Sequence, residues 1–272
     1  YDVQANDTVT RTGTTGAKTN AMSTLPKDYE GFTCTFDASQ EVEIAADQPP
    51  TVTVKYTRNS YTLDLEKDDN IASASASPAK AQYLYGETIS LSATPNVGWN
   101  FAKWTQKDNG NTYSDISFDP QNFTMPAQNL TLKANASAKS GITYTVEHYF
   151  QDLTDESVYT LDSNKTLTKY GTSGTQTQET ATVFDGFTLV TQGEHKFTQE
   201  TILGDGSTVV KAYYNRNSYD LDITKDDNIA SVTIDGQAYT PGTKQSVKFG
   251  ASVTIAASPA AGYDFIKWQL AG

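Results

Sequence analysis

The sequence predicts a mainly β protein, arranged as an elongated array of small tandem modules. Three observations predict this fold class: an extensive internal repeat, short runs in which apolar and polar residues alternate, and an abundance of Tyr and Gly, with 16 and 18 residues. Aromatic residues favour strands, and Gly favours the turns that join them. Only 37% of the 272 residues are hydrophobic, which suits short strands with polar outer faces.

The repeat is clearest in two stretches of sixteen residues. RNSYTLDLEKDDNIAS (58–73) and RNSYDLDITKDDNIAS (216–231) differ only at Thr62/Asp220, Leu65/Ile223 and Glu66/Thr224. Self-similarity at a nearly constant period indicates repeated structural modules.

Further matches extend the repeat in both directions. Upstream, YEGFT (29–33) matches FDGFT (184–188), and downstream YGETISLSATPNVGWNFAKW (85–104) matches FGASVTIAASPAAGYDFIKW (249–268). The spacing between copies drifts by only a few residues, so loops vary in length while the framework stays the same.

We predict two kinds of segment that alternate along the chain: type A at 1–59 and 141–217, and type B at 60–140 and 218–272. The first type-A segment lacks the beginning found in its copy, and the last type-B segment lacks the end. We therefore expect a window of a longer array. The passage from type A to type B contains no Pro or Gly and is expected to be stiff. The passage from type B to type A, NASAKSGITY, is small and polar and is expected to be looser.

The alternation of apolar and polar residues indicates where the strands lie. The first type-B segment carries the runs YTLDLEK, TISLSATP and LTLKANA, and the second carries SVTIAASP. The residues predicted to face inward are Tyr61, Leu63, Leu65, Ile89, Leu91, Ala93, Leu130, Leu132, Ala134, Val253, Ile255 and Ala257. There is no long helical period; at most one short helix is expected, near Thr177 to Phe184.

Composition excludes several classes of partner. A formal net charge of −12 argues against binding to nucleic acid or to anionic membranes, which require clustered Lys and Arg. No apolar run approaches the roughly 20 residues of a membrane span, and a single cysteine excludes an internal disulfide framework. We expect no membrane insertion and a monomer within a longer chain.

The type-B sequence resembles a known family. YGETISLSATPNVGWNFAKW and FGASVTIAASPAAGYDFIKW, followed in the first copy by FTMPAQNLTLKANA, are similar to divergent internalin-type B repeats of bacterial surface proteins. The type-A text YTVEHYFQDL, GTSGTQT, FDGFTLV and VVKAYYNRN is similar to mucin-binding-protein-type repeats, which have a β-grasp fold.

The two resemblances imply a β-grasp-like type A, a compact β-sheet type B and a cell-wall-anchored adhesin or its stalk in a Gram-positive or related bacterium. They supply no catalytic residues.

Large aromatic residues follow a glycine at equivalent positions in both type-B segments. Gly98 and Gly262 are expected in a turn that a Cβ would obstruct. The aromatic pairs that follow are predicted to form the module core: Trp99/Tyr263, Phe101/Phe265 and Trp104/Trp268. Trp99 and Tyr263 are also the candidates for a platform on which a ligand stacks.

Two acidic triplets are the candidates for cation binding. Asp68, Asp69 and Asn70 recur as Asp226, Asp227 and Asn228. Calcium requires six to eight oxygen ligands, more than one triplet supplies, whereas such residues commonly form turns. The turn interpretation is favoured, and no metal or other cofactor is predicted.

Catalytic patterns are lacking in the sequence. His148 and His195 are the only histidines, and both fall in the second copy. His148 is expected to be a half-buried core or rim residue, and His195 to lie in a loop. An isopeptide crosslink through Lys55, Lys133 or Lys211 is less expected than outward-facing lysines. We predict a protein that is not an enzyme.

Repeating a module lengthens the protein and multiplies any binding site that the module carries. The first hypothesis is therefore an extracellular stalk on the bacterial surface that projects a distal binding region. The second is a multivalent binding module for a host glycan, such as mucin, or a host surface protein.

Overall fold

The computed structural model describes residues 8–24 and 28–270. The chain divides into two compact units, one ending at Ala138 and the other beginning at Lys139, next to the predicted boundary at residue 140. Each unit contains one type-A and one type-B segment as predicted above. The predicted boundaries between the segments within a unit stay predictions.

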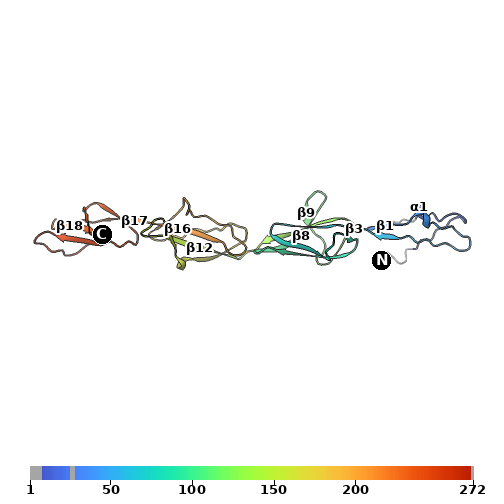
Figure 1. Ribbon diagram of the computed structural model, residues 1–272, viewed down its shortest axis with the longest axis horizontal. Coiled ribbons are helices and arrows are strands. Elements are labelled where there is room, and N and C mark those ends of the chain that lie inside the picture. The colour runs from blue at the N-terminus through green and yellow to red at the C-terminus, as the bar shows by residue number, and fades with distance from the viewer. Residues whose placement is uncertain (1–7, 25–27, 271–272) are drawn as a thin grey trace. The chain divides into compact units, whose positions relative to one another are not determined.

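The predicted mainly β fold of tandem modules is confirmed, because strands dominate both units (Figure 1). The helical elements of the described residues are short: α1 (Ala21–Thr24), η1 (Ala38–Gln40) and η2 (Ser163–Lys165). Within those residues, no helix is long and apolar enough to cross a membrane.

The type-A segment of the N-terminal unit contains a two-stranded sheet. β1 (Phe32–Cys34) pairs antiparallel with β2 (Tyr56–Arg58). The text Thr143–Ser157, which begins the second type-A segment, has no counterpart in the first.

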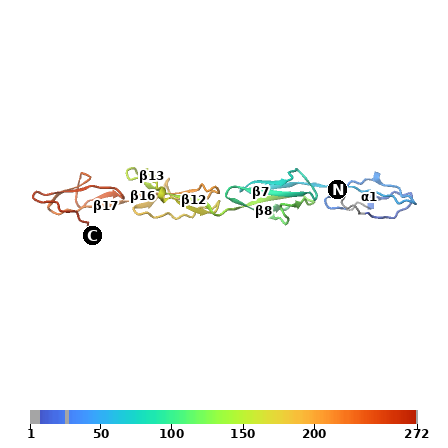
Figure 2. The same ribbon diagram turned by 90° about the horizontal axis from the view of Figure 1, so that it is seen from below.

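The type-B segment of the N-terminal unit is built from nine strands. They are β3 (Ser60–Tyr61), β4 (Leu63–Lys67), β5 (Ile71–Ser77), β6 (Tyr83–Leu84), β7 (Thr88–Pro95), β8 (Trp99–Lys107), β9 (Tyr113–Asp115), β10 (Phe123–Thr124) and β11 (Leu130–Ala138). They form one sheet of order β10-β7-β5, a second of order β4-β11-β8-β9 and a β3–β6 pair. β7 and β8, one from each larger sheet, are labelled in Figure 2.

The core of this segment lies between its two larger sheets. Ile89 and Leu91 of β7 and Leu132 and Ala134 of β11 are completely buried and belong to one apolar cluster. Tyr61, Leu63, Leu65 and Ala93 pack against that cluster. The inward faces predicted from alternation are therefore confirmed in this segment.

The type-A segment of the C-terminal unit is a five-stranded mixed sheet. Its strands are β12 (Ile142–Gln151), β13 (Tyr159–Leu161), β14 (Leu167–Gly171), β15 (Phe187–Leu189) and β16 (Val209–Arg216). The first and last strands, β12 and β16, pair in parallel, whereas β13 and β14 pair antiparallel with β12, and β15 with β16. Figure 1 shows β12 beside β16.

The segment near Thr177 contains no helix. The backbone N–H of Thr177 donates to the carbonyl of Glu200 at 2.8 Å, and its buried hydroxyl donates to Gln199 Oε1. Residues 177–184 contain no helix, so the short helix considered for them is not formed.

The type-B segment of the C-terminal unit has fewer strands. They are β17 (Ser218–Asp222), β18 (Ile229–Ile234), β19 (Gln237–Tyr239), β20 (Lys244–Lys248) and β21 (Ile255–Pro259). β17 pairs with β20, and β18 lies between β19 and β21. Its core is small, with Ile223, Val232 and Ile234 buried. Val253, predicted to face inward, is 36% exposed.

Candidate functional site

In each unit, the chain passes from type A to type B through two consecutive strands that are separated by a single residue. Asn59 separates β2 from β3, and Asn217 separates β16 from β17. Strand structure therefore covers Tyr56 to Tyr61 except for Asn59. We call the residues around each of these asparagines the joint; it comprises Gly31, Phe32, Thr33, Arg58, Asn59, Tyr85 and Gly86 in the first copy and Gly186, Phe187, Thr188, Arg216, Asn217, Phe249 and Gly250 in the second.

The asparagine backbone bonds to both segments. In the first copy, the N–H of Asn59 donates to the carbonyl of Gly31 in type A at 2.8 Å. Its own carbonyl accepts from the N–H of Tyr85 in type B at 2.9 Å. The Thr33 hydroxyl donates to Asn59 Oδ1 at 2.7 Å. Each net hydrogen bond contributes about 1 kcal/mol, so the set fixes how the two segments meet.

The second copy repeats these bonds atom for atom. The N–H of Asn217 donates to the Gly186 carbonyl at 2.9 Å, and the N–H of Phe249 donates to the Asn217 carbonyl at 2.8 Å. The Thr188 hydroxyl donates to Asn217 Oδ1 at 2.7 Å. The same arrangement is thus formed twice, in two separate units.

The type-A glycine of each joint has two reasons to be glycine. Gly31 and Gly186 both have φ of +78°, which L side chains rarely adopt. A Cβ on Gly31 would fall 2.1 Å from Cγ of Tyr85, and one on Gly186 would fall 2.2 Å from Cγ of Phe249. The type-B aromatic ring therefore lies directly against the glycine backbone.

An arginine and two aromatic rings complete each joint. The rings of Phe32 and Tyr85 meet edge to face at 5.7 Å, as do those of Phe187 and Phe249 at 5.6 Å. The guanidinium of Arg58 lies 5.5 Å from the centre of the Phe32 ring. Such aromatic and cation–π contacts stabilise beyond the area they bury.

Arg216 adds bonds that bridge the two segments. Its guanidinium lies 4.8 Å from the centre of the Phe187 ring, and its Nη1 donates to the type-B carbonyl of Phe249 at 2.8 Å. Its Nε and Nη2 donate to the type-A carbonyl of Gln151 at 3.3 and 3.1 Å. One planar side chain therefore holds both segments.

The sequence prediction did not identify the joint as a site. Its residues come from three separate repeated motifs, YEGFT/FDGFT, RNSY and YG/FG, which the fold brings together. The repetition of these motifs could have identified the joint, because their sequences are kept in both copies whereas most surface residues differ between the copies.

The type-B glycines and aromatics lie partly as predicted. Gly98 and Gly262 have φ of +79° and +87°, which confirms the turn. Trp104 is 3% exposed and belongs to the core, because it pairs with Ala134 of β11. Phe101, at 39% exposure, contradicts the core prediction; it lies near the start of β8, past the register shift, at the rim beside the Trp104 ring.

The second copy of this motif is more exposed than predicted. Tyr263, Phe265 and Trp268 are 55%, 40% and 38% exposed, so their assignment to the core is wrong. Residues 263–270 form no strand, whereas their counterparts in β8 pair with β11. Trp99, the other candidate ligand platform, is half-buried in β8. Trp99 and Tyr263 belong to different units.

Comparison with protein families assigns these segments. Residues 67–140 and 228–272 match the divergent InlB B-repeat domain. The resemblance of both type-B segments to internalin B repeats is confirmed, and this is a repeat family typical of surface proteins. The match does not extend to either type-A segment, so the resemblance to mucin-binding repeats stays a prediction. Comparison with curated proteins found no match.

The acidic triplet of the first B-repeat segment forms a turn. Asp68 Oδ1 accepts from the N–H of Asn70 at 2.8 Å, and Asp68 Oδ2 accepts from the N–H of Ala136 in β11 at 2.7 Å. The Asp69 carbonyl accepts from the Asn96 amide at 2.9 Å. Both oxygens of the Asp68 carboxylate are therefore engaged in tying the β4–β5 turn to its neighbours.

The triplet of the second B-repeat segment forms the same turn with fewer bonds. Asp226 Oδ1 accepts from the N–H of Asn228 at 2.8 Å, and the carbonyl of Asn228 accepts from the N–H of Ala260. Asp227 is the remaining member. Across residues 8–24 and 28–270, no three His, Cys, Asp or Glu residues converge as metal ligands.

The histidines of the second type-A segment lie apart from the B repeats. His148 is only 2% exposed, deeper than the predicted half-buried position, and its Nδ1 lies 3.2 Å from the Tyr214 hydroxyl. That hydroxyl donates to the Thr182 carbonyl at 2.9 Å. Burial, with a smaller effect from Lys165, lowers the pKa of His148.

A cluster of half-buried aromatic side chains involves the other histidine. His195 stacks on Tyr213 at 4.4 Å, Tyr213 stacks on Tyr149 at 4.8 Å, and Tyr159 meets both His195 and Tyr213 edge to face. In the first copy, Lys55 takes the place of Tyr213. The cluster is therefore not repeated.

Proposed function

We propose that this chain is a non-enzymatic spacer, the repeat stalk of a bacterial surface adhesin that projects a distal binding region. The observation that carries the proposal is the joint, which recurs with the same bonds in both units. A stalk requires the junction between modules to be reproduced, because each junction that bends freely shortens its reach. Catalysis has no such requirement.

The polar residues that recur also support a structural role. Asn59 and Asn217 bond across the joint, and Asp68 and Asp226 form turns. Each contacts backbone rather than an open site. The proposal therefore includes no catalytic activity, no cofactor, and anchoring to the cell wall in the whole protein.

Small-angle X-ray scattering tests the stalk. A compact chain of 272 residues has a radius of gyration of about 18 Å. The proposal expects a value well above this and a pair-distance distribution with a long tail. A compact profile would exclude the stalk.

A second candidate function rests on the aromatic cluster of Tyr149, Tyr159, Tyr213 and His195. Tyrosines with one polar end serve often as contact residues. The cluster supports a single site for a host glycan or host surface protein rather than a multivalent one, because the first copy lacks Tyr213. A glycan array probed with the chain and with Tyr213→Lys, which reproduces Lys55, tests it; binding that Tyr213→Lys abolishes is the expected result. The absence of any signal removes a host glycan as the ligand of this cluster.

A further inference from the structure

One edge strand of the first B-repeat segment carries no charged side chain. β5 pairs with β7 on one side, and within the described residues no strand pairs with its other side. β4, at the edge of the second sheet, carries three charged residues, Asp64, Glu66 and Lys67. β5 contains only Ile, Ala and Ser. Charged residues or proline commonly protect an exposed strand edge from pairing with another chain, so β5 lacks this protection.

The backbone groups of Ala74 and Ala76 face the free side of β5. Ala76 lies opposite Leu91 of β7. The N–H of Leu91 donates to the carbonyl of Pro120 at 2.7 Å, and its carbonyl accepts from Nε2 of Gln121 at 3.0 Å. Because Leu91 uses both groups towards β10, its partner Ala76 directs its own N–H and carbonyl away from β7. Ala74, two residues earlier, has the same orientation.

The equivalent edge of the second B-repeat segment carries a strand. β18 pairs with β21 in the register in which β5 pairs with β7, and the register shifts at the same place. Val232 and Ile234, the counterparts of the two alanines, pair with Tyr239 and Gln237 of β19. The chain after β5 runs instead to β6, which pairs with β3. This edge of the fold therefore accepts an antiparallel strand, and in the first copy its place on β5 is free.

A lysine at the start of β5 leaves the edge available. Lys67 Nζ donates to the carbonyl of Ile71 at 2.7 Å. In the second copy, Lys225 Nζ donates to the carbonyl of Ile229 at 2.8 Å, although β19 occupies the same edge further along. The lysine therefore caps the first carbonyl without blocking the addition of a strand.

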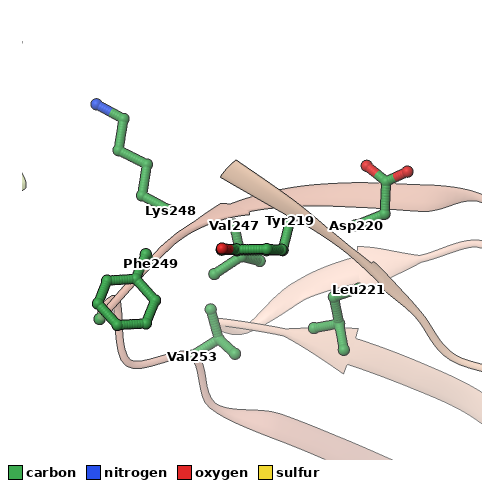
Figure 3. Close-up of a pocket in the computed structure, with 8 residues that line it drawn as sticks. Tyr219, Asp220, Leu221, Val247, Lys248, Phe249 and Val253 are labelled. Carbon is green, nitrogen blue, oxygen red and sulfur yellow. The ribbon is translucent and has the colours of Figure 1, made fainter. Parts of the chain in front are cut away.

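The pocket of the second B-repeat segment is a separate feature. It has a volume of about 320 Å³, and Figure 3 shows Tyr219, Leu221 and Val247 among the side chains around it. Its lining residues lie at 219–221 and 247–253, whereas β18 and β19 span 229–239. The comparison of β5 with β18 is therefore independent of this pocket.

We propose that β5 is a lateral contact between two copies of this chain, in which two β5 strands pair antiparallel about a two-fold axis at Ser75. In this register, Ala74 of each copy lies opposite Ala76 of the other. Each alanine then donates its N–H to its partner's carbonyl, and the sheets of the two copies become continuous. Addition of a strand to a sheet edge is a recognised mode of binding, and a two-fold contact uses the same surface of both copies.

The sequence of β5 favours a second copy as the occupant. In the proposed register, Ala meets Ala and Ser meets Ser across the axis, so no large side chains collide. Residues 70–86 contain one lysine and no acidic residue, whereas the whole chain carries a formal charge of −12. Antiparallel pairing brings the acidic turn of one copy, Asp68 and Asp69, towards the acid-free end of β5 in the other. The contact is therefore self-complementary.

The setting of this contact rests on the proposed stalk. Stalks anchored side by side on one surface meet at a high effective concentration, which makes a small contact sufficient. The pairing itself is a property of the chain in solution. Scattering tests the stalk and sedimentation tests the pairing, so failure of one is distinguishable from failure of the other.

Sedimentation velocity of the 272-residue chain over a concentration series into the millimolar range tests the pairing. A reversible monomer–dimer equilibrium is the expected result. A chain that stays monomeric at every concentration, as expected from the sequence alone, overturns the proposal.

Two matched variants locate the contact. Ser75 and Ser92 are exposed partners on β5 and β7, and their hydroxyl oxygens lie 2.9 Å apart. Ser75→Lys and Ser92→Lys both remove this hydrogen bond, but only Ser75→Lys places like charges opposite each other at the axis. It should weaken the dimer about fivefold or more, whereas Ser92→Lys should leave it unchanged. Equal effects of the two variants contradict the proposed edge. Circular dichroism verifies that both variants fold.

A charge swap tests the two-fold axis. Ser75→Glu alone should weaken the dimer as Ser75→Lys does, whereas an equal mixture of the two variants should associate more tightly than either alone. This rescue is expected because the opposite charges would meet across the axis. A mixture that associates no better than the separate variants contradicts the register at Ser75.

Amide exchange followed by nitrogen-15 NMR tests the backbone bonds. The amides of Ala74 and Ala76 should exchange rapidly in dilute chain and become protected as the concentration rises. The amide of Ser75, directed towards β7, should be protected at both concentrations. A dimer that forms without protecting the two alanines would lie elsewhere on the chain and overturn the proposal.

Discussion

The ring of Phe249 lies so close to Gly186 that a Cβ on the glycine would fall 2.2 Å from ring carbon Cγ. The same relationship holds between Tyr85 and Gly31. A type-B aromatic residue is thus fitted to a type-A backbone in both units. The aromatic residue can be Tyr or Phe, but the glycine cannot gain a side chain without displacing the ring.

Gly186→Ala is expected to destabilise the C-terminal unit by about 1–3 kcal/mol, since it combines an unfavourable φ with a steric overlap. Gly236→Ala is the matched control, because Gly236 has φ of +76° but open space where its Cβ would lie. Urea unfolding of both variants separates the two costs. Equal losses of stability would show that the Phe249 contact is unimportant.

Arg216→Lys is expected to loosen the joint of the C-terminal unit. Lysine keeps the charge but cannot reproduce the planar set of bonds to Gln151 and Phe249. Nitrogen-15 relaxation should show types A and B of this unit tumbling together in the wild type and less so in the variant. Lys211→Arg, on the exposed side of β16, should leave tumbling unchanged. Identical tumbling in all three proteins would contradict a bridging role for Arg216.

Asp68→Ala is expected to cost about 1–3 kcal/mol, because two backbone N–H groups lose a charged acceptor. Asp226→Ala in the second copy should cost less, since Asp226 accepts one such bond. Thermal unfolding with and without calcium measures both effects. A calcium-dependent rise in melting temperature that Asp68→Ala removes would replace the turn interpretation with a metal site.

Stability of the C-terminal unit is expected to fall on mild acidification because of His148. Burial lowers the pKa of this imidazole, Lys165 lowers it further, and Asp162 and Glu179 act in the opposite direction. The unfolded chain then binds a proton near its ordinary pKa of about 6.5, before the folded chain does. The contribution of neutral His148 is therefore complete above that pH and is lost as the pH falls through and below it.

Urea unfolding between pH 5 and 8 measures this dependence. His148→Gln should flatten the curve over that interval, and His195→Gln, at a half-buried position on Tyr213, serves as the control. A curve that stays unchanged in His148→Gln would assign the dependence to other groups.

The alternation of apolar and polar residues was enough to predict the strands of the first B repeat. It directly predicts the inward side of four residues: Leu63, Ile89, Leu91 and Leu132. It was not enough for residues whose burial depends on a distant strand. Trp104 and Trp268 occupy the same place in the motif, yet only Trp104 has β11 against it. The parallel pairs β4–β11 and β12–β16 join strands far apart in the chain, which no local period reveals.

The joint illustrates the same limit. Gly31, Asn59 and Tyr85 each belong to a repeated motif, but the sequence does not show that the three meet. The role of Asn59 is carried mainly by its backbone groups, whose partners are set by the fold.

The parallel pairing of β12 with β16 determines how the second type-A segment would respond to a pulling force. Its first and last strands lie side by side, in register from Thr145 opposite Val209 to Phe150 opposite Tyr214. Tension applied through the chain at Ile142 and Arg216 would slide one strand along the other. All the backbone bonds between the two strands would then share the load, instead of breaking one after another from an end.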